Sequence, residues 1–142
     1  MTGSLADART QTGAAKTVAD ILTAAADLIE PEGRWTTGAF ARTVKGRVIG
    51  SSEAPATCWC AVGAVYRSAY PHGSYRVYRA LELLSDTVGC YHIGGWNDAP
   101  ERTQAEVVAA LRAAAEKART ANSVGTQPRS GEVRPNQTGD DQ

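Results

Sequence analysis

The chain has 142 residues and equal numbers of basic and acidic side chains, 15 of each, so its formal net charge at pH 7 is zero. A neutral chain offers no electrostatic attraction to nucleic acid or to an anionic membrane, and no apolar run approaches the roughly 20 residues that a bilayer crossing needs. Three cysteines form a poor disulfide framework, and the N-terminus lacks a secretion signal, so we expect a cytoplasmic protein.

The two ends of the chain differ from the middle in composition. Residues 1–13 are small and polar, and residues 120–142 hold two valines and no larger apolar side chain. Neither segment can bury enough apolar surface to offset the entropy of ordering it. We therefore predict disordered termini on either side of a single compact helical domain at residues 14–119.

The first half of this domain predicts a helix followed by a hairpin. Apolar side chains recur at three- and four-residue steps and form one face of a helix: Val18, Ile21, Leu22, Ala25, Leu28 and Ile29. Pro31 and Gly33 follow and end this helix. The next segment, RTVKGRVIG, alternates apolar and polar side chains around Lys45-Gly46, which is typical of a small β-hairpin.

Three more helices are predicted in the second half. One runs from about Thr57 to Tyr70, and the next follows PHGS with Ser74 as its N-cap. The last begins at TQAE, where Thr103 and Glu106 form a capping-box pattern. The predicted fold is mainly α: a compact four-helix domain with a small β-hairpin between the first two helices.

Four motifs follow one another along the chain: GRWTTGAFAR, KGR, CWCAVGA and WNDAPERTQAEVVAALRAAA. In this order they resemble a family of small uncharacterised proteins, a domain of unknown function, from bacteria, notably actinobacteria, and their phages. The resemblance covers about residues 17–116 and rests on the patterns WCA-x-GA and WND. It implies a shared compact fold and a bacterial or phage origin, and it implies no activity, cofactor or catalytic residue. Cys60, Trp96, Asn97 and Asp98 lie within the matching motifs, whereas Cys58, Cys90 and His92 lie outside them.

One interpretation of the cysteines is a thiol-dependent hydrolase or transferase. A cysteine near a helix N-terminus has its thiolate stabilised by the helix dipole and by unpaired backbone N–H groups. Cys58 or Cys60 could then act as the nucleophile, with His92 as its base. Asn97 or Asp98 would orient the imidazole, in the chain order of papain-like enzymes. The short interval between the histidine and these residues argues against it, because little room is left for the sheet of a papain-like fold.

A second interpretation is a zinc site. Its ligands would come from a Cys-x-Cys pair and a Cys-x-His pair: Cys58, Cys60, Cys90 and His92. Side chains two residues apart on a helix point about 200° apart around its axis, so the first pair could share an ion only if Cys58 precedes the first turn. The pair also falls short of the usual spacing of about two to four intervening residues, so no metal is predicted.

A third interpretation, which explains most of these features, makes the same residues part of the fold. Cys60 would pack as a buried, protonated and unreactive side chain, so that Cys60→Ser would bury a hydroxyl without an assured partner. Gly63 would let a neighbouring segment approach its helix closely, which would justify a glycine in a helix interior. The tryptophans would be core anchors whose indole N–H groups bond to loop carbonyls.

The WND segment has a structural interpretation as well. Asp98 would be an N-cap, with Pro100 in the first turn after it and Glu101 three residues on, and Asn97 would close the preceding turn. The glycines at 94 and 95 would permit the bend that returns the chain to the core. The predicted structural set is Trp35, Trp59, Cys60, Gly63, Trp96, Asn97 and Asp98.

No motif identifies a reaction, so we expect an interaction protein. The domain size and the absence of a cofactor loop favour a small intracellular binding or regulatory module that contacts a protein partner and carries no cofactor. The sequence leaves the partner and the oligomeric state open. Arg67, Arg76 and Arg79 would favour a helix-turn-helix in the second and third predicted helices. The zero net charge and the long YPHGS link argue against such a nucleic-acid role.

Overall fold

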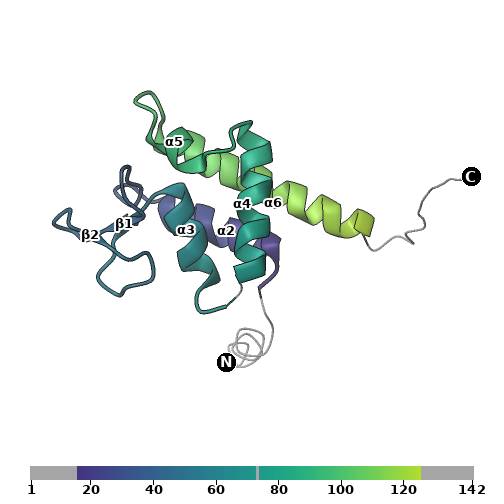
Figure 1. The fold of residues 1–142 in the computed structure, drawn as a ribbon, viewed down its shortest axis with the longest axis horizontal. Coiled ribbons are helices and arrows are strands. Elements are labelled where there is room, and N and C mark those ends of the chain that lie inside the picture. The colour runs from purple at the N-terminus through teal and green to yellow at the C-terminus, as the bar shows by residue number, and fades with distance from the viewer. Residues whose placement is uncertain (1–15, 73, 126–142) are drawn as a thin grey trace, which may run out of the picture.

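A computed structural model describes residues 16–72 and 74–125 of the chain. In chain order its elements are α2 (Val18–Ile29), β1 (Ala41–Arg42), β2 (Val48–Ile49), β3 (Cys58–Trp59), α3 (Ala61–Ala69), α4 (Ser74–Val88), α5 (Ile93–Asp98) and α6 (Gln104–Gly125) (Figure 1). The predicted mainly α class is confirmed. The count of four helices is wrong, since the described residues form five.

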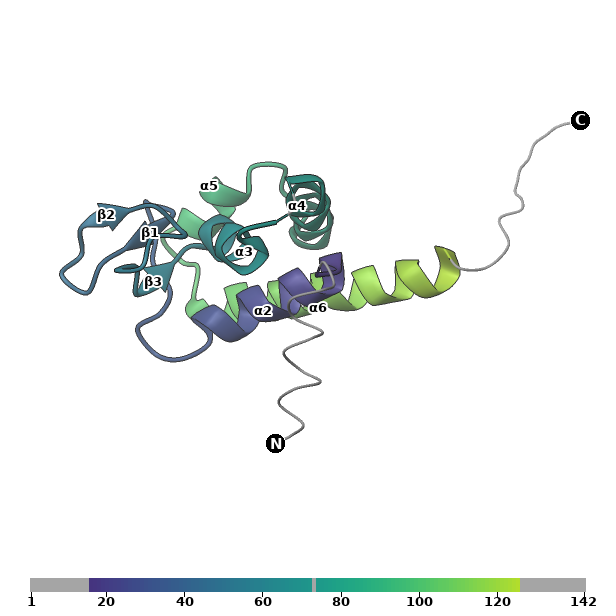
Figure 2. The ribbon, with the colours of Figure 1, turned by 90° about the horizontal axis from the view of Figure 1, so that it is seen from below.

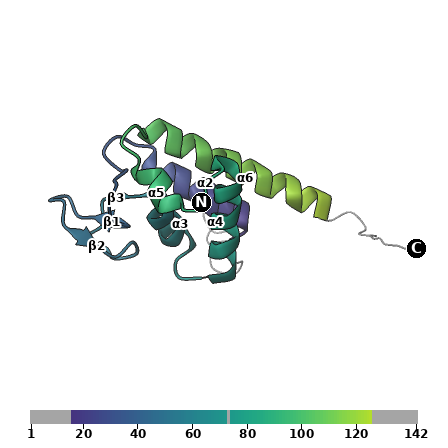
Figure 3. The same ribbon diagram turned by 45° about the horizontal axis from the view of Figure 1, so that its top comes forward.

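The helices form two layers. Figure 2 shows α2 and α6 side by side, with α3 and α4 on one side of this pair. The small sheet lies at one end of the helices, and at the opposite end α6 extends past its neighbours (Figure 3). None of the helices in the described segments combines the length and apolarity that a bilayer crossing requires.

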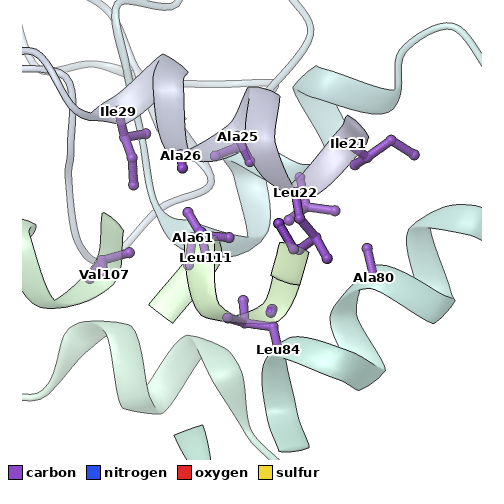
Figure 4. Packing of buried hydrophobic residues seen from close by; sticks show 14 of the residues in the cluster. Ile21, Leu22, Ala25, Ala26, Ile29, Ala61, Ala80, Leu84, Val107 and Leu111 are labelled. Carbon is purple, nitrogen blue, oxygen red and sulfur yellow. The ribbon is translucent and has the colours of Figure 1, made fainter. Parts of the chain in front are cut away.

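The core is built on the apolar face of α2. Its side chains Ile21, Leu22 and Ile29 are 0–2% exposed and pack among residues of α3, α4 and α6 (Figure 4). Alanines separate the larger side chains along this face and allow close helix packing. Leu84 of α4 and Leu111 of α6 are buried in the same cluster. The periodicity that predicted these helices therefore marks real buried faces.

Capping side chains fix where two helices begin. The Thr17 hydroxyl accepts a hydrogen bond from the backbone N–H of Asp20 at 3.0 Å, and the Asp20 carboxylate accepts one from Thr17 N–H at 3.2 Å. The predicted box before α6 is confirmed: Glu106 N–H donates to the Thr103 hydroxyl at 3.2 Å, and Thr103 N–H donates to the Glu106 carboxylate at 3.0 Å. These bonds satisfy N–H groups that a helix leaves unpaired.

The predicted hairpin is present, and a third strand joins it. Strand β1 pairs antiparallel with β2, with Ala41 opposite Ile49, and the intervening turn closes through a 2.8 Å bond from Gly46 N–H to the Thr43 carbonyl. Gly46 has a φ of 88°, a conformation that suits glycine. The other edge of β1 pairs antiparallel with β3 at Cys58 and Trp59.

This third strand corrects the start of the second predicted helix. Cys58 and Trp59 are extended because they pair with β1, so α3 begins at Ala61 and not near Thr57. Cys60 is the N-cap, with φ −82° and ψ 176°. The Cys-x-Cys pair therefore lies on a strand and a helix cap. Ser74 begins α4 as its first residue, and position 73, where an N-cap would lie, is outside the described residues.

The segment from His92 to Asp98, predicted as a loop, forms a short helix with its N-cap. Residues Gly94 and Gly95 lie inside the short helix α5 and do not form a bend. His92 is the N-cap, and its Nδ1 accepts a 2.8 Å hydrogen bond from Gly95 N–H. A side-chain acceptor at this position offsets the poor helix propensity of two glycines.

The C-terminal boundary also differs from its prediction. Helix α6 continues to Gly125, so the boundary between residues 119 and 120 falls inside a helix. Ala114, Ala115 and Ala118 are buried, and they carry the packed face of α6 almost to that boundary. The predicted terminal segment 1–13 and residues 126–142 of the predicted tail lie outside the described residues.

Candidate functional site

Asn97 is a buried polar centre that joins three parts of the chain. Its side chain is 0% exposed. Its Oδ1 accepts hydrogen bonds from the Trp35 indole at 2.8 Å and from Ala61 N–H at 3.0 Å. Its Nδ2 donates to the Thr36 carbonyl at 3.2 Å and to the Asp98 carboxylate at 2.9 Å. Every hydrogen-bonding position of the amide is therefore occupied.

These bonds correct the predicted role of Asn97, because none of them closes the turn that precedes it. Ala61 is the first residue of α3, and its N–H has no partner within that helix. Asn97 supplies the acceptor from α5, across 36 positions of sequence. The same side chain holds the segment after α2 against α3 through Trp35 and Thr36.

Asp98 also acts across the fold and does not cap α6. It is the last residue of α5, and α6 starts only at Gln104, so the predicted N-cap is wrong. Its Oδ1 accepts from Gly38 N–H at 3.1 Å as well as from Asn97 Nδ2. The WND motif thus fastens the loop at residues 35–38 to α5.

A backbone approach explains Gly63. A Cβ atom placed at this position would lie 2.0 Å from the carbonyl oxygen of Phe40. That carbonyl also accepts a 3.2 Å hydrogen bond from Cys60 N–H. The chain before β1 therefore lies directly on the first turn of α3, and only glycine leaves room for it.

Two of the three predicted tryptophans, Trp35 and Trp59, lie at this junction. Trp35 and Trp59 form a parallel bridge, with Trp59 N–H donating to Arg34 and Thr36 N–H donating to Trp59. The Trp59 indole donates to the Ser51 carbonyl at 2.8 Å, as predicted for a core anchor. Trp96 is half-buried, and the Arg102 guanidinium lies 4.1 Å from its ring centroid. Trp35 and Trp59 thus lie with Cys60, Gly63 and Asn97 around the start of α3, whereas the Trp96 ring contacts Arg102.

The Cys60 thiol caps the N-terminus of α3. The residue is 5% exposed, and its Sγ accepts a 3.3 Å hydrogen bond from Gly63 N–H. Burial raises the pKa of the Cys60 thiol, against smaller opposing effects of backbone hydrogen bonds at Gly63 and Val62. The nearby Asp98 charge also raises this pKa. A thiol in this setting keeps its proton at neutral pH.

The remaining candidate residues make contacts of their own. Cys58 and Cys90 are half-buried, and their sulfurs contact backbone carbonyls, Arg42 O at 3.9 Å and His92 O at 3.4 Å. The exposed His92 ring caps α5 through Nδ1. Within residues 16–72 and 74–125, no cysteine sulfur is hydrogen bonded to that ring. These side-chain contacts of Cys58, Cys90 and His92 are thus with the backbone.

The proposed zinc ligands are likewise not gathered. Within the part of the chain that the structure describes, no group of three or more His, Cys, Asp or Glu side chains could hold a metal ion. Cys58 belongs to β3 and Cys60 caps α3, while Cys90 and His92 both lie just before α5.

The cap at Cys60 changes the expected effect of Cys60→Ser. Serine is a preferred N-cap, and its hydroxyl could accept from Gly63 N–H as the sulfur does. We expect Cys60→Ser to lower the free energy of unfolding by less than about 1 kcal/mol, and Cys60→Ala by about 1–2 kcal/mol. Urea denaturation of the three proteins measures both losses. A larger loss for serine than for alanine would contradict the capping role.

A groove that the sequence did not predict is lined mainly by residues of α4 and of the start of α5. Its volume is about 690 Å³. The lining residues come from three elements and the segment before α5: Val62, Tyr78, Leu81, Glu82, Ser85, Asp86, Tyr91, His92, Ile93 and Gly94. The sequence signal for it is the spacing of Tyr78, Leu81, Glu82 and Ser85 at steps of three or four residues along one side of a helix.

The groove combines apolar and polar side chains that reach solvent. Tyr78 is 66% exposed and Tyr91 is 96% exposed. Ile93 is buried, and Val62 and Leu81 are half-buried, so they supply an apolar lining. The described residues that line the groove include two carboxylates and neither Lys nor Arg.

Comparison with known proteins gives one family match. The profile of DUF6197, a family of unknown function, matches residues 13–117. No curated protein and no solved structure matches the chain. The matched segment contains the Asn97 junction, the Cys60 cap and the groove. The chain therefore belongs to DUF6197, a family of unknown function.

Proposed function

We propose that this protein is a small binding module that holds a segment of a protein partner in the groove between α4 and α5. The observation that carries this proposal is the exposure of two tyrosines in one groove, 66% for Tyr78 and 96% for Tyr91. Tyrosine is enriched at protein interfaces because its ring supplies a large contact area and its hydroxyl a hydrogen bond. A bacterial or phage origin and a cytoplasmic location remain part of the proposal.

Apolar side chains continue on the surface beyond the groove, which favours a protein over a small molecule as the partner. Val62 in the groove and Tyr66 are one turn apart on α3, so they are neighbours on its surface. The Tyr66 ring centroid lies 6.1 Å from that of Phe40, and these side chains are 39% and 56% exposed. An apolar surface thus continues from the groove across α3 toward the hairpin. Contiguous surfaces of this kind mark interaction sites.

The arrangement of the cysteines favours binding over the alternative of a thiol-dependent hydrolase or transferase. Cys60 is buried and accepts a backbone N–H, and the amide of Asn97 is fully used in holding the fold. His92, the base of that alternative, lines the groove instead. The surface of α4 and α5 is therefore the part of the molecule best suited to contact a second molecule.

Photo-cross-linking from defined positions tests the proposal. The photoreactive residue p-benzoylphenylalanine replaces Tyr91 in one variant and Tyr75 in the control, and both proteins are irradiated in the native host cells. Tyr75 is 75% exposed on the same helix, α4, as Tyr78, but it borders a different groove, with Thr17 and Ala118. We expect one defined cross-linked protein from position 91 and none of that protein from position 75.

Two outcomes of the cross-linking would contradict the proposal. The same products from both positions, or a product from position 75 alone, would contradict binding in the groove. Because both tyrosines are exposed, neither replacement should change the thermal unfolding of the domain, and circular dichroism melts provide that control.

A further inference from the structure

One side of the groove is acidic. Tyr78, Glu82 and Asp86 follow one another at four-residue steps on α4, and all three line the groove. Residues four apart on a helix are neighbours on its surface, so Glu82 lies between Tyr78 and Asp86 along this side of α4. The groove therefore presents two anionic groups in a row with an aromatic ring.

These carboxylates are available to a ligand. Glu82 forms an ion pair with Arg79 at 2.9 Å, and the two side chains are 64% and 40% exposed. An exposed pair of this kind contributes little to stability, so a second cation can compete for the carboxylate. Asp86 is exposed and forms no ion pair within the described residues.

Tyr91 adds a second aromatic ring to the same groove. It is 96% exposed, so its ring faces are open to a ligand. A cation over a tyrosine face is attracted by the ring, and the attraction grows when water is displaced. This protein already contains one such contact, between Arg102 and Trp96 at 4.1 Å.

We propose that the groove recognises a partner segment through a basic side chain, arginine or lysine, bound by Glu82 and Asp86 and packed against Tyr78 and Tyr91. This inference rests on the proposed function and names its ligand chemistry. Charge complementarity and the absence of Lys and Arg among the groove residues select a cation. Val62, Leu81 and Ile93 accommodate apolar side chains next to it, so the ligand is an extended peptide with a basic residue between aliphatic ones.

Binding of three matched peptides tests this inference. The probes are fluorescein-labelled Gly-Leu-Arg-Leu-Arg-Gly and two analogues in which citrulline or glutamate replaces both arginines. Citrulline has nearly the shape of arginine and no charge. Fluorescence anisotropy gives the Kd of each peptide, and NMR shifts of the 91–94 backbone amides locate the site. We expect the arginine peptide to bind at least about tenfold more tightly than the citrulline peptide, and the glutamate peptide to be weakest.

Charge-removing variants supply the control. The double variant Glu82→Gln, Asp86→Asn should abolish the preference for arginine over citrulline. Glu116→Gln, which removes an exposed carboxylate paired with Arg119 on α6, should leave that preference unchanged. All three replaced side chains are exposed, so the fold should be intact in each variant.

Several results would overturn the inference. Equal binding of the arginine and citrulline peptides in the groove would exclude a cationic anchor and leave the groove as a protein-binding surface. A preference unaltered by the double variant, or no shift at 91–94 with any peptide, would also overturn it. Cross-linking from position 91 would then still decide the proposed function. Binding seen only after deletion of residues 126–142, which contain Arg129 and Arg134, would assign the groove to the chain's own segment.

Discussion

Replacing Asn97 with alanine is expected to lower the free energy of unfolding by about 3–5 kcal/mol. The change removes four hydrogen bonds from a side chain that is 0% exposed. It leaves the Trp35 indole and Ala61 N–H without their acceptor, and each buried group without a partner costs about 1–3 kcal/mol. Urea denaturation followed by tryptophan fluorescence measures this loss.

Asp98→Asn is the matched control for Asn97→Ala. The Oδ1 of the new asparagine could still accept from Gly38 N–H, and the side chain at position 98 is exposed. We therefore expect the free energy of unfolding to fall by less than about 1 kcal/mol. A small loss for Asn97→Ala, similar to that of the control, would show that water replaces the Asn97 bonds and that the junction is not needed for the fold.

Gly63→Ala is the second change with a large expected effect. Alanine in place of glycine inside a helix ordinarily stabilises it by about 1 kcal/mol. Here the new Cβ would lie 2.0 Å from the Phe40 carbonyl oxygen, a backbone atom, so α3 and the segment before β1 must separate. We expect the sign to reverse, with a loss of about 3 kcal/mol or more in the free energy of unfolding.

Gly94→Ala provides the comparison for Gly63→Ala. Gly94 also lies inside a helix, but a Cβ there would meet only the His92 ring, at ordinary contact distances of 3.5 Å to Cε1 and 3.8 Å to Nδ1. We expect Gly94→Ala to be neutral or to stabilise the protein by up to about 1 kcal/mol. Equal effects at the two positions would contradict the close approach at Gly63.

Sequence reasoning identified the elements that local patterns encode. Helices α2, α4 and α6 have apolar stripes, and the box of Thr103 and Glu106 marks the start of α6. The hairpin turn has its glycine at position 46, where φ is positive. Each of these signals lies within a few residues of the element that it predicts.

The elements that were missed depend on distant parts of the chain. Strand β3 has only two residues, and it is extended because it pairs with β1, so α3 starts later than its periodicity predicted. Helix α5 contains two adjacent glycines, which argue against a helix locally. It is capped by His92, which is not one of the common N-cap residues, and it is fixed to α3 by the buried Asn97 across 36 positions.

In the candidate site, too, residue roles could be predicted from the sequence, but contacts between distant residues could not. Trp35, Cys60 and Asn97 were predicted as structural residues, and the structure brings them together with Gly63. The partners of Asn97 could not be predicted, because its bonds to Trp35 and Ala61 span 62 and 36 positions. The groove was missed for a related reason, since α3, α4 and α5 must all be placed before it exists.

The central claim is that the groove between α4 and α5 is where this protein binds its partner. Isothermal titration calorimetry with the partner identified by cross-linking tests it most directly, using the wild type, Tyr91→Ala and the control Tyr75→Ala. We predict that Tyr91→Ala raises the Kd at least about tenfold, as expected for an interface hot spot, while Tyr75→Ala leaves it within about twofold. An unchanged Kd for Tyr91→Ala, or an equal increase for both variants, would contradict the claim.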